Sequence, residues 1–574
     1  MFKKNQRHLQ LPLTSSVDEL PPKLRKRLDT SWSGAFYREF FSRLDEAPFA
    51  ILYADCPSRP NIPVNVLVGL EYLKAGNGWT DEEMLDNFGY NSQVRYALGY
   101  RQLGEGDFEP RTLYYFRERL SRYMQETGIN LLEKAFEQVT DQQIAAYHLK
   151  TGKQRMDSTQ IASNIREMGR LQLLVEVLQR VHRMLTEKDQ GDYEEVFAPY
   201  LKGSAGQYIY HLKGEETSEH LQKIGERMQR LVGDLQANYK EEPVYKVLCK
   251  VFGEHFRVEE KTLKTKIGKE LSASSLQSPD DLEATYRKKN NKSYKGYVAN
   301  LTETCDPENE LQLITKVQVA SNNKEDAQML IEALPNLKER TEIETLYTDG
   351  GYGSPAADGS LQKHEVEQIQ TAIRGRVPSS KKLNLADFKF KQSESGKPTQ
   401  VTCPQEQKEA VHSSSQKKSF VAHFDDKVCQ ICPFLPKCPV QRGKRDTRFH
   451  LRFTQSQVNM SQRRQRSLIH QEEGRNLRAA VEATVRQVKH PFPAGKLPVR
   501  GHFRVTCMVI GSAMTANVRR IQRYLEAKIK LENEQKKAQR GQGCTQEQPS
   551  DSYFVFLMAI FRGWMVKNSQ TARI

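Results

Sequence analysis

Apolar positions in the first 150 residues recur at the spacing of helices. Four apolar residues within 66–73 share one helical face. Thr80 followed by Glu83 has the form of a capping box and predicts the start of another short helix. A third apolar face predicts one longer helix over about 112–139. Residues 1–145 are therefore predicted to form a helical domain that binds DNA, although any small helical bundle has a similar pattern.

The pattern changes after residue 150, where alternating and helical segments follow one another. The segment 154–161 reads as a strand, and two apolar stripes within 165–285 predict a helical insertion. The predicted elements that follow have the order of an RNase H-like α/β core. They are strands at 294–302 and 311–319, a helix at 324–334, and strands at 344–348 and 367–373.

Chain length and net charge limit the classes of function that this protein can have. With 574 residues the chain is too long for one core, so two to four domains are expected. A net charge of +16, from 87 Lys and Arg against 71 Asp and Glu, favours a polyanionic partner such as nucleic acid. The longest apolar run, 553–561, is less than half of the roughly 20 residues that span a bilayer. No secretory signal is visible, so we expect a bacterial cytoplasmic, nucleoid-associated protein with no membrane contact.

Three acidic residues far apart in the sequence stand in motifs that suit metal ligands. Asp157 lies in Met-Asp-Ser-Thr, at a strand end, and Asp349 follows a predicted buried strand and precedes two glycines that let the chain turn. Glu482 lies in a predicted helix. Mg²⁺ prefers such oxygen ligands, and two ions about 3.5–4 Å apart can stabilise both oxygens of an in-line phosphoryl displacement. In a basic protein, this set predicts a nuclease-like site.

These motifs resemble those of the DDE transposases of bacterial insertion sequences, over about residues 36–524. The N-terminal segments 53–60, 95–99 and 110–120 are similar to the helical domain of such enzymes, and Asp-Gly-Gly-Tyr at 349–352 is similar to their second acidic motif. The resemblance implies an RNase H-like catalytic domain. It also implies that Asp157, Asp349 and Glu482 are catalytic and bind Mg²⁺, which Mn²⁺ can replace.

The third motif of this family is Tyr, two residues, Arg, three residues, Glu, six residues, Lys. Arg478, Glu482 and Lys489 keep this spacing, but Arg475 occupies the Tyr position. One long helix from about Ser461 is expected to carry all four residues, with Arg478 and Lys489 reaching phosphates on either side of Glu482. Taken alone, an Arg–Glu pair four residues apart is usually a surface ion pair. The predicted DNA- and phosphate-binding residues are Arg475, Arg478, Lys489, Arg500, Arg519 and Arg520.

Four cysteines form a separate candidate site. Cys429, Cys432 and Cys438, with Cys403 upstream, could supply four thiolates to a structural Zn²⁺. The alternative is a set of reduced, buried thiols, with His412 or His423 as substitute ligands.

The expected architecture is an α/β, RNase H-like catalytic core with a helical N-terminal domain and two insertions, one helical and one small and cysteine-rich. The domain boundaries are predicted as follows: N-terminal domain 1–145; catalytic core 150–164, 286–377 and 456–525; helical insertion 165–285; cysteine-rich insertion 378–455; C-terminal tail 526–574, whose polar stretch 531–550 is expected to be mobile.

The predicted function is cleavage of double-stranded DNA at the ends of an insertion sequence, followed by joining of the 3′-hydroxyl to target DNA. The resemblance implies a homodimer or higher oligomer that bridges two transposon ends. Two alternatives share most of these features. One is a non-catalytic DNA-binding regulator, and the other is a metal-dependent endonuclease without strand transfer.

Overall fold

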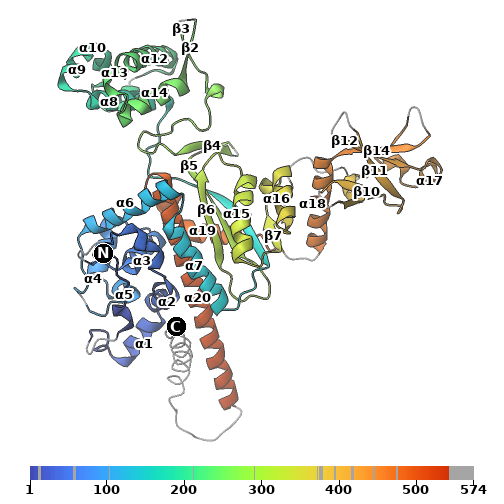
Figure 1. Cartoon of the computed structure of the whole chain (residues 1–574), viewed down its shortest axis with the longest axis horizontal. Coiled ribbons are helices and arrows are strands. Elements are labelled where there is room, and N and C mark those ends of the chain that lie inside the picture. The colour runs from blue at the N-terminus through green and yellow to red at the C-terminus, as the bar shows by residue number, and fades with distance from the viewer. Residues whose placement is uncertain are drawn as a thin grey trace. The chain divides into compact units, whose positions relative to one another are not determined.

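The computed structural model (Figure 1) consists of two compact units, Met1–Gln522 and Arg523–Ile574. All described elements lie in the first unit except the last helix, which continues into the second. The residues described are 1–10, 15–55, 60–102, 104–210, 212–260, 262–289, 291–371, 373, 379, 381–393, 396–414, 419–443, 447–472 and 476–541.

The N-terminal region is helical, as predicted. The Thr80 capping box is confirmed, because its hydroxyl accepts from the Glu83 amide and the Glu83 carboxylate accepts from the Thr80 amide. The single helix expected over 112–139 is two helices. Gly128 ends the first in the left-handed conformation (φ 74°), and the Asn130 side chain caps the second. The helices are α1 (Pro22–Thr30), α2 (Trp32–Glu39), α3 (Val64–Asn77), α4 (Asp81–Tyr90), α5 (Ser92–Ala97), α6 (Pro110–Thr127) and α7 (Leu131–Ala146).

A mixed sheet follows, and its strands confirm those predicted around the acidic motifs. Its order is β6-β5-β1-β7-β8, with β4 also paired to β5. The pairs β1–β5 and β5–β6 are antiparallel, whereas β1–β7 and β7–β8 are parallel. Helices α15 (Asp326–Arg340) and α16 (Pro355–Lys363) lie between the last three strands in sequence. The strands are β1 (Lys153–Ile161), β4 (Thr285–Lys289), β5 (Lys292–Thr304), β6 (Ile314–Ser321), β7 (Thr345–Thr348) and β8 (Glu367–Gln370).

The region between β1 and β4 is helical, as predicted, and has a hydrophobic core of its own. The two apolar stripes read from the sequence lie on α8 and α12, and both are buried in this core. The elements are α8 (Arg170–Met184), α9 (Glu187–Asp192), α10 (Glu194–Phe197), α11 (Ala205–Tyr210), α12 (Thr217–Asp234), α13 (Gln236–Tyr239), α14 (Pro243–His255), β2 (Phe256–Glu259) and β3 (Thr262–Thr265).

The cysteine-rich region contains more regular structure than the polar sequence suggests. It forms a second sheet, of order β13-β14-β12-β11-β10-β9, in which every pair is antiparallel. Buried apolar residues cover one face of this sheet. The elements are β9 (Lys389–Gln392), β10 (Pro398–Thr402), β11 (Lys408–Ser414), β12 (Ser419–Phe424), α17 (Asp426–Gln430), β13 (Gln441–Arg442) and β14 (Phe449–Thr454).

The long helix expected from Ser461 onwards is two helices, α18 (Gln455–Glu472) and α19 (Val481–Lys489). The Asn476 side chain accepts from the amides of Arg478 and Ala479, so the chain turns there and a new helix begins. The last helix, α20 (His502–Gly541), includes the first part of the stretch expected to be mobile. Among the described helices, none combines the length and apolar character needed to cross a membrane.

His255 makes the helical region between β1 and β4 sensitive to acid. It is buried at the end of α14, and its Nδ1 accepts from Arg170 Nε at 3.0 Å. Burial, followed by the charges of Arg170 and Lys266, lowers the pKa of His255 to about 4. The unfolded chain therefore takes up a proton at a higher pH than the folded chain does. Stability from this group is complete above about pH 6.5 and is lost as the pH falls towards 4.

We expect the free energy of unfolding of the insertion to fall by about 3 kcal/mol between pH 6.5 and pH 4 because of this histidine. Hydrogen exchange of α8 and α14 amides at several pH values would measure it. His255→Gln, which keeps an acceptor for Arg170, should remove most of this pH dependence. His182→Gln, on α8 and only half-buried, is the control. An equal pH dependence in His255→Gln would contradict the assignment.

Candidate active site

Two of the three predicted acidic residues are brought together by strand register. In the parallel β1–β7 pair, Lys153 lies opposite Thr345 and Arg155 opposite Tyr347. Asp157 and Asp349 have the same offset in residue number, so both lie at one level where β7 ends. Asp349 then caps a short 3-10 turn, and its Oδ1 accepts from the Gly351 amide at 2.7 Å. The glycines after Asp349 thus hold its carboxylate in place.

Asp157 is largely enclosed. Its side chain is 13% exposed, and its Oδ2 lies 3.1 Å from Arg478 Nη2. Burial raises the pKa of Asp157, and the neighbouring charge of Asp349 raises it further, while Arg478 opposes both effects. Two carboxylates of like negative charge at close quarters favour an added cation.

Glu482 lies in the first turn of α19. Its side chain is 59% exposed, and its Oε1 is 3.9 Å from Arg478 Nη1. Arg478 therefore stands between Asp157 and Glu482. Within the described residues, no three Asp, Glu, His or Cys side chains are arranged closely enough to hold a metal ion. Asp157 and Asp349 are brought together, whereas Glu482 is next to their arginine partner and faces solvent.

A buried carboxylate that sequence reasoning missed attaches α19 to the sheet. Glu303 on β5 is fully buried. It accepts from Arg155 Nε at 2.6 Å, from Thr484 Oγ1 at 2.6 Å and from Arg520 Nη1 at 2.7 Å. Arg155 also donates to the Leu477 carbonyl at 2.7 Å, next to Arg478. The one available signal was a glutamate directly after the uncharged stretch 296–302 of a predicted strand.

The basic residues predicted to bind phosphate differ in the hydrogen bonds and ion pairs that their side chains already form. Lys489 Nζ donates to the Gln160 carbonyl at 2.9 Å and to Thr159 Oγ1 at 3.3 Å. Burial, and then the charge of Lys292, lower the pKa of Lys489. Lys489 lies at the end of α19 beside β1, on the side of that strand that Arg478 also contacts.

The remaining candidates lie around α20. Arg500 is exposed and donates to the Asn164 carbonyl at 2.6 Å. Arg519 donates to Asn77 Oδ1 at 3.0 Å. Arg520 is held by Glu303, so its role is structural. Arg475 lies outside the described residues.

The four candidate zinc ligands gather around one apolar cavity of about 30 Å³, under the second sheet. Cys403, Cys429, Cys432 and Cys438 are all free thiols and half-buried. Burial raises the pKa of the Cys429 thiol to about 11, with smaller contributions from the other three sulfurs. The thiols therefore lie near one another. By contrast, His412 and His423 occupy strand positions on the opposite face of this sheet.

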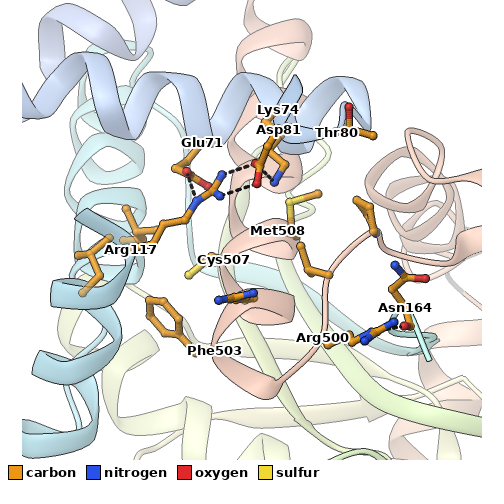
Figure 2. A pocket seen from close by; sticks show the side chains of 15 residues that line it. Glu71, Lys74, Thr80, Asp81, Arg117, Asn164, Arg500, Phe503, Cys507 and Met508 are labelled. Atoms are coloured by element: carbon orange, nitrogen blue, oxygen red, sulfur yellow. Dashed lines mark hydrogen bonds and ion pairs between the residues drawn. The ribbon is translucent and has the colours of Figure 1, made fainter. Parts of the chain in front are cut away.

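A larger cavity, of about 350 Å³, lies between the N-terminal helices and α20 (Figure 2). Arg117 bridges Glu71 and Asp81, with nitrogen–oxygen distances of 2.6 Å to each, and Lys74 contacts Asp81 at 2.6 Å. Although burial opposes it, these two cations lower the pKa of Asp81 well below its usual range. The carboxylates of Glu71 and Asp81 both form ion pairs that join α3, α4 and α6. The charged residues that line this cavity therefore stabilise helix packing.

Residues 402–522 match the family model described as the transposase DDE domain. The match supports a DDE transposase. It contains Arg478, Glu482 and Lys489, whereas Asp157 and Asp349 lie outside it. No curated protein and no solved structure matches the chain. The assignment of the first two acidic residues therefore depends on the strand register.

Glu303→Gln tests whether the buried carboxylate holds this part of the fold. The substitution leaves two guanidinium groups buried without a counter-charge, so we expect the free energy of unfolding to fall by about 3–5 kcal/mol. Glu308→Gln, on the exposed loop after β5, is the matched control and should change it by less than about 1 kcal/mol. Denaturant unfolding would measure both. Equal effects of the two variants would show that Arg155 and Arg520 do not depend on Glu303.

Proposed function

We propose that this protein is a transposase that cuts DNA at the ends of its insertion sequence and joins the 3′-hydroxyl to target DNA by two-metal phosphoryl transfer. One observation carries the proposal. Asp157, within β1, and Asp349, directly after the parallel strand β7, lie at one level, and Arg478 joins Asp157 to the segment that carries Glu482. This arrangement supports a site in which the three acidic motifs of the family resemblance act together.

The sheet supports an RNase H-like core for this domain. Strand β5 pairs antiparallel with β1 and with β6, and β7 and β8 extend the other side of β1 in parallel. Helices separate β6 from β7 and β7 from β8. The domain boundaries that follow are those predicted from the sequence, with the helical and cysteine-rich regions as insertions.

The donor set fits a hard divalent cation. Asp157 and Asp349 offer carboxylate oxygens at one level of the sheet. Burial and then the charge of Asp349 raise the pKa of Asp157, and a bound Mg²⁺ or Mn²⁺ would relieve this repulsion. Glu482 would complete the set from α19. When bound, such ions activate water and stabilise the charge on the transferred phosphoryl group.

The protein's own residues would position the DNA. Arg478, which contacts Asp157, can also present a planar pair of donors to a phosphate beside the carboxylates. Lys489 adds a point charge at the end of α19, about two turns beyond Glu482. Positioning and charge stabilisation of this kind carry phosphoryl transfer without a covalent protein–DNA intermediate.

The partners are double-stranded transposon ends and target DNA. A homodimer or higher oligomer would bring two ends together. We place this activity at the bacterial nucleoid, where both DNA partners are found.

The decisive experiment is cleavage and joining on a duplex that carries the element's own end sequence, with Mg²⁺ and then with EDTA. Asp349→Asn keeps an oxygen acceptor for the Gly351 amide but removes the charge. Loss of residues outside a metal's ligand shell costs about 10–100-fold, so loss of a ligand should cut cleavage at least about 100-fold. Glu339→Gln, on the exposed side of α15, is the control and should cleave normally.

The outcomes separate the three functions. Metal-dependent cleavage and joining that Asp349→Asn abolishes support the transposase. Cleavage without joining would favour an endonuclease. End binding with no cleavage in Mg²⁺ or Mn²⁺ would favour a DNA-binding regulator.

We also propose that the four cysteines hold a structural Zn²⁺. Their sulfurs already influence one another's pKa, and thiolate is the ligand that tetrahedral structural zinc prefers. A bound cation would offset that repulsion and join α17 to the loop after β10.

Metal analysis of the purified protein should find about one Zn²⁺ per chain. Cys432→Ser should lose it and destabilise the second sheet, because binding free energy of structural zinc contributes to folding. Cys249→Ser, in the helical insertion, should keep it. If the wild-type protein is equally stable with and without zinc, the result favours the alternative that the cysteines are reduced thiols with no structural metal.

A further inference from the structure

The second sheet has two chemically different faces. Its inward positions form a buried core that includes Val401, Ala422, Phe424 and Leu451. Side chains alternate between the two faces of a strand, so the residues on either side of these point outward. The sheet thus presents its other face to solvent.

Four permanent cations occupy that outward face. Lys389 pairs across β9, β10 and β11 with Thr402 and then Lys408. Lys391 lies two positions along β9, and Arg452 lies on β14. All four cations are exposed. We call these four residues the basic face.

The basic face lacks counter-charges. Within the part of the chain that the structure describes, none of the four cations forms an ion pair. No outward position of the described strands is Asp or Glu. The other outward residues are Gln400, Thr402, Ala410, His412, Ser419, Val421, His423, Gln441, His450 and Thr454.

We infer that the basic face binds the phosphate backbone of duplex DNA, outside the catalytic site. Neighbouring strands lie about 4.8 Å apart, so the four steps from β9 to β14 span about 19 Å. A duplex carries about one negative charge per 1.7 Å of axis, so a stretch of this length offers a phosphate to every cation. The inference rests on the proposed action on DNA and adds where the cysteine-rich insertion meets that DNA.

The chemistry of the face determines the mode of binding. Lysines recognise phosphates as point charges and carry little sequence information. The basic face therefore contributes affinity and orientation for any duplex, and a stable sheet holds its cations at fixed spacing. A Zn²⁺ held by the four cysteines on the inward side would help to keep the sheet, and so the basic face, rigid.

The test uses the full-length protein and a labelled random-sequence duplex in EDTA, so that binding is measured without cleavage. The variant combines Lys389→Gln, Lys391→Gln, Lys408→Gln and Arg452→Gln. Its matched control removes four exposed charges from the helical insertion, through Lys188→Gln, Lys202→Gln, Lys240→Gln and Lys250→Gln. Dissociation constants are measured between about 50 and 200 mM salt, because the slope of affinity against salt counts phosphate contacts.

We expect the basic-face variant to bind at least about tenfold more weakly, with a salt slope lower by as much as about 3.6, at about 0.9 per contact. The control should keep the wild-type slope. A slope no lower than the control's overturns the inference. Cleavage of the element's ends by the wild type is measured separately. If the wild type cleaves and the basic-face variant binds DNA as tightly as the wild type does, only the DNA-binding role of the basic face is refuted. If the variant binds DNA more weakly but the wild type does not cleave, only the proposed transposase activity is refuted.

Discussion

The carboxylate of Glu303 joins four segments that are far apart in the chain. Through Arg155 it holds β1, through Thr484 it holds α19, and through Arg520 it holds α20. A fully buried carboxylate is costly unless it is paired and hydrogen-bonded, and here two guanidinium groups and a hydroxyl meet that requirement. The same contacts make the packing directional, because apolar packing alone would let α19 slide or rotate against β1.

The candidate active site depends on that fixed packing. Asp157 lies two residues after Arg155 on the same face of β1, and Arg478 follows Leu477, whose carbonyl accepts from Arg155. The ion pair between Asp157 and Arg478 is therefore positioned by a neighbouring, more deeply buried interaction. Asp349 is positioned independently, by the β1–β7 register and by the Gly351 amide. Strand pairing thus positions Asp349, whereas the buried interaction of Arg155 with Glu303 positions Asp157 and Arg478.

The helical region between β1 and β4 and the cysteine-rich region are built differently. The helical one has an apolar core of its own and buries His255 without charge, whereas the cysteine-rich one has a small core beneath a single sheet and four thiols at its edge. A small apolar core supplies little stability, which is the circumstance in which proteins use a structural metal. A rigid sheet in turn allows lysines on its outer face to keep a fixed spacing.

Local sequence pattern was enough to locate much of this protein. Alternation marked β5 and β6, a short apolar segment marked β7, and helical periodicity marked α8 and α12. The Asp-Gly-Gly turn placed Asp349 at a strand end. These signals act between residues close in sequence. The tertiary structure decided the rest. The break at Asn476, the burial of Glu303, the structural use of Arg520 and the unpaired cations of the second sheet all depend on which distant segments meet. Such meetings change the surroundings of a side chain without leaving a local pattern, so an arginine bound to a buried glutamate and one free for phosphate look alike until the chain is folded.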